Sequence, residues 1–162
     1  MSAFSLAYSR ALPVIKSEDA NIPYPATIRT SATTGAVGPN TLTDSGATFV
    51  TDMVAPGDIV YNLTDQVAAT VVSVTNQNVL LLNANIIAAI GKNYILYRAS
   101  SQTTIGNYGC YLYIGVTGNV FVDTIGDDLN VIFQSVPAGT ILPVQVKKLR
   151  AGTTALNIIA LW

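Results

Sequence analysis

The sequence has no histidine and only one cysteine, Cys110, among its 162 residues. One cysteine cannot form an internal disulfide, and a zinc cluster needs several Cys or His ligands. A nucleophilic triad needs a general base, which is usually histidine. The sequence therefore argues against a disulfide framework, a Cys/His metal site and histidine-dependent catalysis. Cys110 begins an apolar run, so we expect a buried, unreactive thiol.

Charged residues are also scarce: they make up 10% of the chain, whereas typical soluble domains have about 25%. The net charge is −1, the pI is about 5.0 and the basic residues are spread along the chain, so we expect no nucleic-acid partner. Hydrophobic residues reach 50%, and the mean hydropathy is +0.44. So little charge predicts that partners cover part of the surface, as in obligate oligomers.

Long hydrophobic runs are missing as well. A membrane-spanning helix needs about 20 apolar residues, but the most apolar stretch, "VLLLNANIIAAIG", is interrupted by Asn83 and Asn85. The opening "MSAFSLAYSR" lacks the basic leader and the apolar stretch of a secretory signal. We therefore expect no membrane partner.

The residues that are abundant favour β-structure. The strand-favouring residues Val, Ile, Thr and Tyr are well represented, as is Asn, and clusters of Gly, Pro or Asn interrupt the apolar runs every ten or so residues. The sequence predicts an all-β fold: an N-terminal extended arm followed by two small antiparallel β-sandwich or β-barrel modules. The predicted strands are 57–64, 69–75, 78–83, 93–98, 110–115, 119–125, 129–136, 142–149 and 155–162.

Composition changes near 31–44 and 99–109 divide the chain. We expect an arm over 1–29, an inserted β module with linkers over 30–107 (core about 45–98) and a C-terminal β-sandwich module over 108–162. Three prolines in the arm favour extended backbone. The arm has three interpretations: a loose end, a segment laid across another surface, or an edge strand of the C-terminal sheet. Deletion of 1–25 should leave a folded protein in the second case and unfold it in the third.

Several turns can be placed. "TNQN" (75–78) and "GDD" (126–128) predict tight hairpins, because Asn and Asp tolerate positive φ. In "VPAGTILPVQVKKL" (136–149), Pro137 and Gly139 predict a turn, and Pro143 limits pairing at the start of the next strand. The last predicted strand places four apolar residues on one face: Leu156, Ile158, Ala160 and Trp162.

The candidate chemical groups have structural interpretations. Asp123, Asp127 and Asp128 are close in sequence, but the last two occupy a turn, where aspartate bonds to nearby backbone; a bound cation and a glycosidase-type acid pair are the alternatives. Asp58 follows a Pro-Gly turn and is read as structural. We predict no catalytic residue, no metal ligand and no cofactor, and hence no enzyme. A sugar-stacking strip remains an alternative from five tyrosines: Tyr94, Tyr97, Tyr108, Tyr111 and Tyr113.

Two segments resemble proteins encoded by tailed bacteriophages. Residues 41–97 contain "FV…VAPGDIVYN", then "ATVVSV" and "YILY", and look like a small β module that recurs in phage structural proteins. Residues 111–162 contain "VPAGTILPVQV", "AGTTA" and an aromatic final residue. This pattern resembles the spike-base-like proteins of phages and gene-transfer agents, and "LPVIKSEDANIP" (12–23) is similar to the stretch that precedes it there. The middle module would then be an insertion.

The resemblance implies a non-enzymatic virion protein on the capsid exterior, assembled in the bacterial cytoplasm. We expect a capsid decoration (cement) protein whose partners are the major capsid protein and its own copies, as a trimer. A head-spike or fibre base, or a tail-tip component, is the alternative within this class, and a carbohydrate-binding module is the alternative outside it. The candidate contact residues are Leu12, Val14, Ile15, Ile22, Tyr24, Ile28, Lys147, Lys148 and Arg150.

Overall fold

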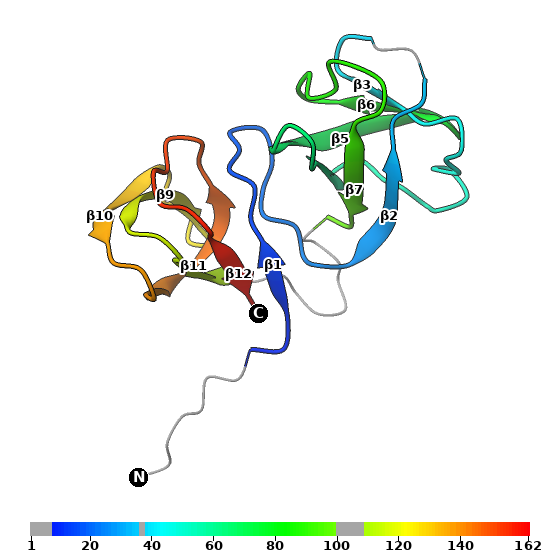
Figure 1. Ribbon diagram of the computed structural model, residues 1–162. Helices are drawn as coiled ribbons and strands as arrows, with labels where there is room; N and C mark the ends of the chain where they lie inside the picture. The colour runs from blue at the N-terminus through cyan, green and yellow to red at the C-terminus, as the bar shows by residue number, and fades with distance from the viewer. Residues whose placement is uncertain (1–7, 36–37, 100–108) are drawn as a thin grey trace.

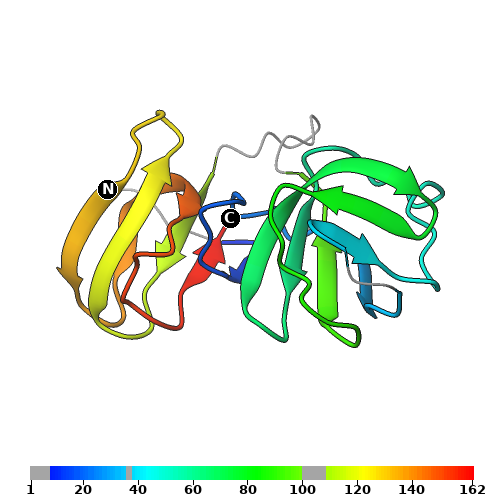
Figure 2. The same cartoon turned by 90° about the horizontal axis from the view of Figure 1, so that it is seen from above.

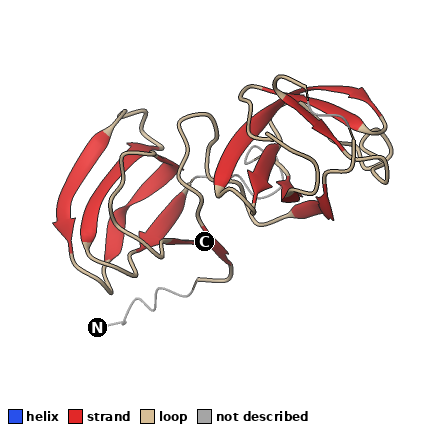
Figure 3. Ribbon diagram, turned by 45° about the horizontal axis from the view of Figure 1, so that its top comes forward, coloured by secondary structure: helices blue, strands red, loops and turns tan. Residues whose placement is uncertain are grey.

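The computed structural model describes residues 8–35, 38–99 and 109–162. Over these ranges the chain forms two antiparallel sheets of six strands each, contains no helix and does not close either sheet into a barrel (Figure 3). The predicted all-β class is therefore confirmed. The described part of the chain accordingly has no helix long and apolar enough to span a membrane.

The C-terminal sheet combines strands from both ends of the chain, whereas all strands of the middle sheet lie between residues 27 and 97. The C-terminal sheet runs, in spatial order, through β1 (Ala11–Pro13), β12 (Ile159–Leu161), β8 (Cys110–Tyr113), β11 (Ile141–Leu149), β9 (Gly118–Thr124) and β10 (Val131–Val136). The middle sheet runs through β2 (Thr27–Ala32), β7 (Asn93–Tyr97), β4 (Ile59–Asn62), β5 (Val67–Asn76), β6 (Val79–Leu82) and β3 (Thr41–Thr43). Figure 1 shows the two sheets side by side, with β1 and β12 between them.

Each sheet has its own apolar core, formed by alternate residues of its strands. In the C-terminal sheet, Cys110 and Leu112 of β8 point into the core with Val120, Val122 and Val146. The middle core contains Leu42, Phe49, Val60, Leu80, Tyr94 and Leu96. Tyr97 belongs to a third cluster instead, because residues three positions apart in a strand point to opposite faces of the sheet.

The predicted hairpins form, although not all for the expected reason. Asp127 has a φ of 66°, as the "GDD" turn requires. In the 75–78 turn, neither Asn76 nor Asn78 has a positive φ. Instead the Asn76 side-chain oxygen accepts a hydrogen bond from the Asn78 N–H at 2.8 Å, while the Asn78 side chain donates to three carbonyls in the 44–47 loop. The asparagines therefore stabilise the hairpin through their side chains.

The proline corner at the start of β11 also forms. The Thr140 N–H donates to the Pro137 carbonyl at 3.3 Å, and Gly139 has a φ of 83°. The pairing between β8 and β11 shifts register after Leu142, next to Pro143, which has no N–H to donate. The corner thus sets the irregular start of the strand that follows it.

The last predicted strand is shorter than expected. Only Ile159–Leu161 form β12, because Asn157 has a φ of 53° and interrupts the extended backbone. Ile158 and Ala160 are buried, but Leu156 is 53% exposed and makes an isolated bridge to Val116. The prediction that Leu156 shares a face with the residues after it is therefore wrong.

The segment after Ser9 is an edge strand and a connector, the third of the interpretations of the arm. Ala11–Pro13 pair antiparallel with Leu161–Ile159, and the N–H groups of Ser17 and Ile22 donate to carbonyls of β11 at 2.9 and 2.8 Å. On its other side the Ser17 hydroxyl donates to the Ala68 carbonyl of β5 at 3.0 Å. The segment lies between the two sheets, as the view from above shows (Figure 2).

The side chains of this connector belong to both units. Ile22 lies in the C-terminal core, whereas Leu12, Ile15 and Ala20 form the third cluster with residues of the middle sheet. That cluster also contains Ile59, Tyr61, Ala68 and Tyr97, with Trp162 packed against it. The connector therefore joins the two sheets by apolar burial as well as by hydrogen bonds.

Candidate assembly surface

One face of the C-terminal sheet is apolar even though it points away from the core. Along β8 the buried residues Cys110 and Leu112 alternate with Tyr111 and Tyr113, which are half-buried. In β11 the buried Leu142 lies between Ile141 and Pro143, which are both exposed. We call this the outer face and define it by Ala11, Pro13, Tyr111, Tyr113, Ile141, Pro143, Ile159 and Leu161.

Strand register aligns most of the outer face in two rows. In the first row Pro13 is opposite Ile159, Ile159 is opposite Tyr113, and Tyr113 is opposite Ile141. In the second row Ala11 is opposite Leu161, which is opposite Tyr111. Directly opposed residues have Cβ atoms about 4.5–5.5 Å apart. The rows therefore make one continuous apolar strip over four adjacent strands.

The outer face contains no charged side chain, and its polar atoms are the two tyrosine hydroxyls. An antiparallel sheet with one solvated face normally alternates apolar and polar residues. Tyrosine combines a large apolar area with a polar tip and is enriched at protein interfaces. The outer face therefore has the composition of an interface.

The predicted contact residues of the arm lie elsewhere. Leu12, Ile15 and Ile22 are buried within the chain, with 3–8% of their surface exposed. Val14 packs against the C-terminal core and Ile28 against the middle core. All five side chains make contacts within the chain. A partner could not reach the three buried ones, Leu12, Ile15 and Ile22.

Tyr24 lies beside the end of β12. Its ring packs against Trp162 in an edge-to-face arrangement with centroids 5.7 Å apart, and the Arg10 guanidinium lies 5.3 Å above it. Arg10 also donates to the Pro25 carbonyl at 3.1 Å. Tyr24 is half-buried and thus remains partly accessible at the junction of the two sheets.

The three basic residues predicted to contact a partner instead bind groups of the same chain. Lys147 forms an ion pair with Asp127, and the Lys148 ammonium donates to the Glu18 carbonyl at 2.8 Å. Arg150 makes a two-pronged contact with Asp123, at 2.7 and 2.9 Å, and a further ion pair with Glu18 at 2.6 Å. These cations tie the turn and the connector to β11.

The predicted acidic group is likewise structural. Asp123 is 3% exposed, and its carboxylate accepts hydrogen bonds from Arg150 and from the Asn130 N–H. Asp128 accepts from the Thr124 hydroxyl at 3.1 Å, which closes the turn. Over the described ranges, no group of three or more His, Cys, Asp or Glu side chains is arranged to hold a metal ion. Asp58, also buried, accepts from the N–H groups of Ala55 and Ala99, as its structural interpretation predicts.

Electrostatics agrees with these roles. Burial raises the pKa of the Cys110 thiol to about 12, so the thiol stays protonated near neutral pH. Burial alone would raise the pKa of Asp44, but hydrogen bonds from Tyr94 and the Gly46 N–H, with the charge of Arg29, lower it below its ordinary value. Burial and Arg150 act in the same opposing way on Asp123, and its pKa is again lowered.

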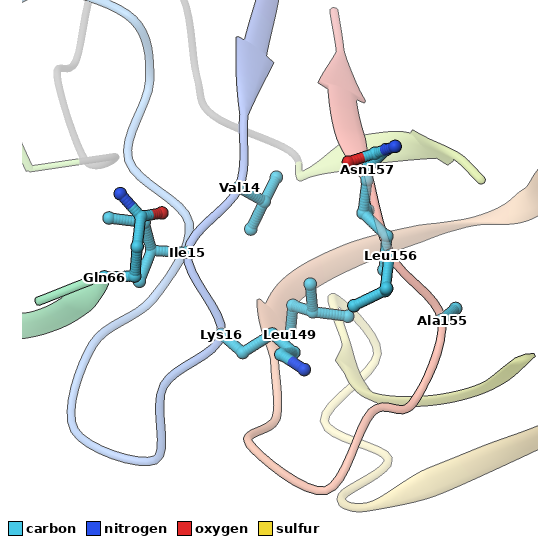
Figure 4. A pocket seen from close by; sticks show the side chains of 9 residues that line it. Val14, Ile15, Lys16, Gln66, Leu149, Ala155, Leu156 and Asn157 are labelled. Atoms are coloured by element: carbon cyan, nitrogen blue, oxygen red, sulfur yellow. The ribbon is translucent and has the colours of Figure 1, made fainter. Parts of the chain in front are cut away.

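A small pocket opens between the connector and the C-terminal sheet (Figure 4). It has a volume of about 170 Å³ and is lined mainly by apolar side chains, with Lys16, Gln66 and Asn157 as the polar ones. Lys16 is already bound to the Thr153 carbonyl at 2.8 Å, and Gln66 donates to the Leu63 carbonyl at 2.7 Å. The pocket offers few polar groups to a ligand.

The five tyrosines considered for sugar stacking do not share one surface. Tyr94 and Tyr97 are buried in different clusters, and the Tyr94 hydroxyl donates to Asp44 at 2.7 Å. Tyr108 lies outside the described residues. Only Tyr111 and Tyr113 reach the outer face, where Tyr8 packs on Tyr111 with ring centroids 6.0 Å apart.

Alternation along a single strand places Tyr111 and Tyr113 on the same face, but the sequence-based predictions did not include the rest of the outer face. The signal was present in "ILPV", where the usual polar alternation is absent over 141–144. A strand that is apolar on both faces indicates that both faces become covered. Placing Pro13 and Ile159 beside these residues, however, required the pairing of β1 with β12.

Comparison of the chain with models of known protein families, with curated protein sequences and with solved protein structures gave no match.

Proposed function

We propose that this chain is a non-enzymatic structural protein of a tailed-bacteriophage virion, a capsid decoration protein that docks on the shell through the outer face of its C-terminal sheet. The observation that carries the proposal is the uncharged strip formed by Pro13, Ile159, Tyr113 and Ile141 on four adjacent strands. The resemblance of 111–162 to spike-base-like virion proteins supports the same class.

The energetics of a shell favour such a surface. Burial of apolar area contributes about 25 cal/mol per Å², so one contact of this kind is modest. Repetition over the many equivalent positions of a capsid multiplies its effect on the shell without any individual contact being strong. A protein whose few charged side chains largely pair with one another within the chain, and whose outer face is apolar, suits this role.

Co-sedimentation with capsids tests the docking surface. Purified protein should pellet with shells of the phage that encodes it after its own copies have been stripped. Tyr113→Asp and Ile141→Lys place a charge on the outer face and should reduce binding at least tenfold while circular dichroism stays unchanged. The control is Val72→Lys, because Val72 is 47% exposed on the middle sheet, away from the outer face.

The outcome separates the proposal from its alternatives. Equal binding by all the variants would contradict the outer face as the docking surface. Binding confined to vertices, seen by electron microscopy of labelled protein, would favour a spike base over a cement protein. No binding of the unaltered protein to any part of the virion would contradict the proposed function.

A further inference from the structure

The ends of the two sheets are not equally protected. A free sheet edge exposes unpaired N–H and C=O groups, and proteins protect such edges with short strands, prolines or charges. At one end of the C-terminal sheet, β1 has three residues and includes Pro13. In the middle sheet, β3 has three residues and β2 carries Arg29. These three edges each have a protecting feature.

The fourth edge, β10, differs from the others. It has six residues, contains neither proline nor charge, and among the described strands it pairs on one side only, with β9. The uncharged stretch continues from 129 to 146. Figure 1 shows β10 at the end of the molecule that lies away from the middle sheet. A bulge follows Phe133, but the segment before it pairs in regular register with β9.

The side chains of β10 are incompletely covered on both faces. Val131 and Phe133 pack against the C-terminal core but are only half-buried. Ile132, on the opposite face, is 46% exposed, and Leu129, just before the strand, is 65% exposed. A further strand beside β10 would extend the core layer over Val131 and Phe133 and would cover Ile132.

We propose that the strand beside β10 is the β10 of a second copy of this chain, antiparallel to it, so that two C-terminal sheets join into one. Antiparallel self-pairing places the same surface on both sides of a two-fold axis. With the axis beside Ile132, each Val131 lies opposite the second copy's Phe133 and the two Ile132 side chains are neighbours.

The absence of charge along β10 favours a second copy as the occupant of this edge. Self-pairing brings identical side chains together, so a charged edge would repel its own copy. Residues 129–136 have no charge and therefore no such repulsion, and Val131 and Phe133 complete the same apolar layer from both copies. The inference rests on β10 alone and is independent of capsid binding, because the outer-face strip lies on β1, β12, β8 and β11.

The test is the mass of the full chain in solution, measured by light scattering after gel filtration over a range of concentrations. We expect twice the chain mass of 17.0 kDa, in place of the trimer expected from the sequence resemblance. Ile132→Lys should shift the mass to that of the monomer, because it places two ammonium groups side by side. Val72→Lys is the matched control, since Val72 has a similar exposure of 47% on the other sheet, and it should leave the dimer intact.

Cross-linking gives a second readout that does not depend on a charged variant folding. Directly opposed residues have Cβ atoms about 4.5–5.5 Å apart, so Ile132→Cys should form an intermolecular disulfide on mild oxidation. Val72→Cys should remain mostly monomeric on a non-reducing gel, and Cys110 is buried. A monomer at all concentrations, a trimer, or a dimer that neither Ile132 substitution affects would overturn the inference.

Discussion

At the scale of single residues, most of the arginines of this protein pair with buried carboxylates of the same chain. Three of the four arginines contact a buried aspartate: Arg29 with Asp44, Arg98 with Asp58, and Arg150 with Asp123. Each pair joins segments that are distant in sequence. A buried carboxylate that loses its cation keeps its desolvation cost, so these pairs specify where loops attach.

Removal of one arginine tests this role. Arg150→Ala should lower the free energy of unfolding by about 2 kcal/mol, because it leaves the Asp123 carboxylate buried beside the Asn130 N–H alone. Urea denaturation followed by fluorescence measures the change. The matched control is Lys92→Ala, whose ion pair with Asp65 lies at the surface, where solvent screens it, and this substitution should have a much smaller effect. Equal effects of the two substitutions would contradict the account.

Acid should weaken the same pairs. The folded-state pKa values of Asp44 and Asp123 are lowered, whereas the pKa of an aspartate in the unfolded chain is about 3.9. A group with a lowered folded pKa stabilises the fold above its unfolded pKa, and this contribution is lost as the pH falls toward the folded pKa. We expect the Tm to stay level from neutral pH to about pH 5 and to fall below about pH 4. A Tm that rises on acidification would be the contrary result.

The Cys110 thiol should be inert in the folded protein. Its pKa of about 12 keeps it protonated near pH 8, and only 1% of the residue is exposed. A disulfide thiol reagent should therefore label the native chain negligibly and label the urea-unfolded chain at one thiol per molecule. Rapid labelling of the native chain would show that the C-terminal core opens at β8.

At the scale of elements, the sequence predicts the strongly patterned strands well. Runs such as "CYLYIG" and "NVFVDTI" alternate clearly, and they form β8 and β9 close to their predicted bounds. The short strand Thr41–Thr43 and the polar strand Thr27–Ala32 escaped prediction, and an edge strand such as Ala11–Pro13 was only one of three interpretations of the arm. They have few apolar residues, and their extended conformation is imposed by the strands they pair with.

The connector shows what local patterns cannot supply. Its apolar residues suggested contact with a partner, but Leu12, Ile15 and Ile22 are buried between the two sheets of the same chain. An apolar extended segment has the same sequence pattern in both cases. The distinction depends on long-range pairing, here of β1 with β12, which no local pattern contains.

Deletion of residues 1–25 should therefore prevent stable folding. It removes β1 and the buried Leu12, Ile15, Ala20 and Ile22. Each of the three larger side chains contributes about 1.5–3 kcal/mol on burial, and small domains are stable by only about 5–15 kcal/mol. Circular dichroism and thermal melting should show loss of the cooperative transition, whereas deletion of residues 1–7 should preserve it. A shortened chain with an unchanged Tm would contradict the connector role.

At the scale of the whole molecule, the sheets form a unit built from internal charge pairs and external apolar strips. The connector packs on both sheets: the Ser17 hydroxyl donates to the Ala68 carbonyl of β5, and the Asp19 carbonyl accepts hydrogen bonds from the Thr70 hydroxyl of β5 and from the Asn83 side chain just after β6. The outer face and the β10 edge are among the apolar surfaces that stay accessible. Such surfaces are what the proposed assembly role requires of a protein with only 10% charged residues.

The all-β class was predicted from composition and periodicity, and the proposed assembly role was inferred from composition, but the residues of the outer face could not be identified in this way. Tyr111 and Tyr113 could be placed together by alternation within one strand. Pro13, Ile159 and Ile141 join them only because strands from both ends of the sequence meet in one sheet. Spatial order among strands is set by the long-range packing of the core, which single-strand patterns do not encode.

The copy number of this chain in purified virions tests the central claim most directly. Quantitative mass spectrometry of virions of the encoding phage would compare the chain with the major capsid protein. A decoration protein bound over the whole shell should be present at a copy number comparable with that of the major capsid protein. A copy number restricted to the few vertices or to the tail would contradict the cement role, and absence from virions would contradict the virion assignment altogether.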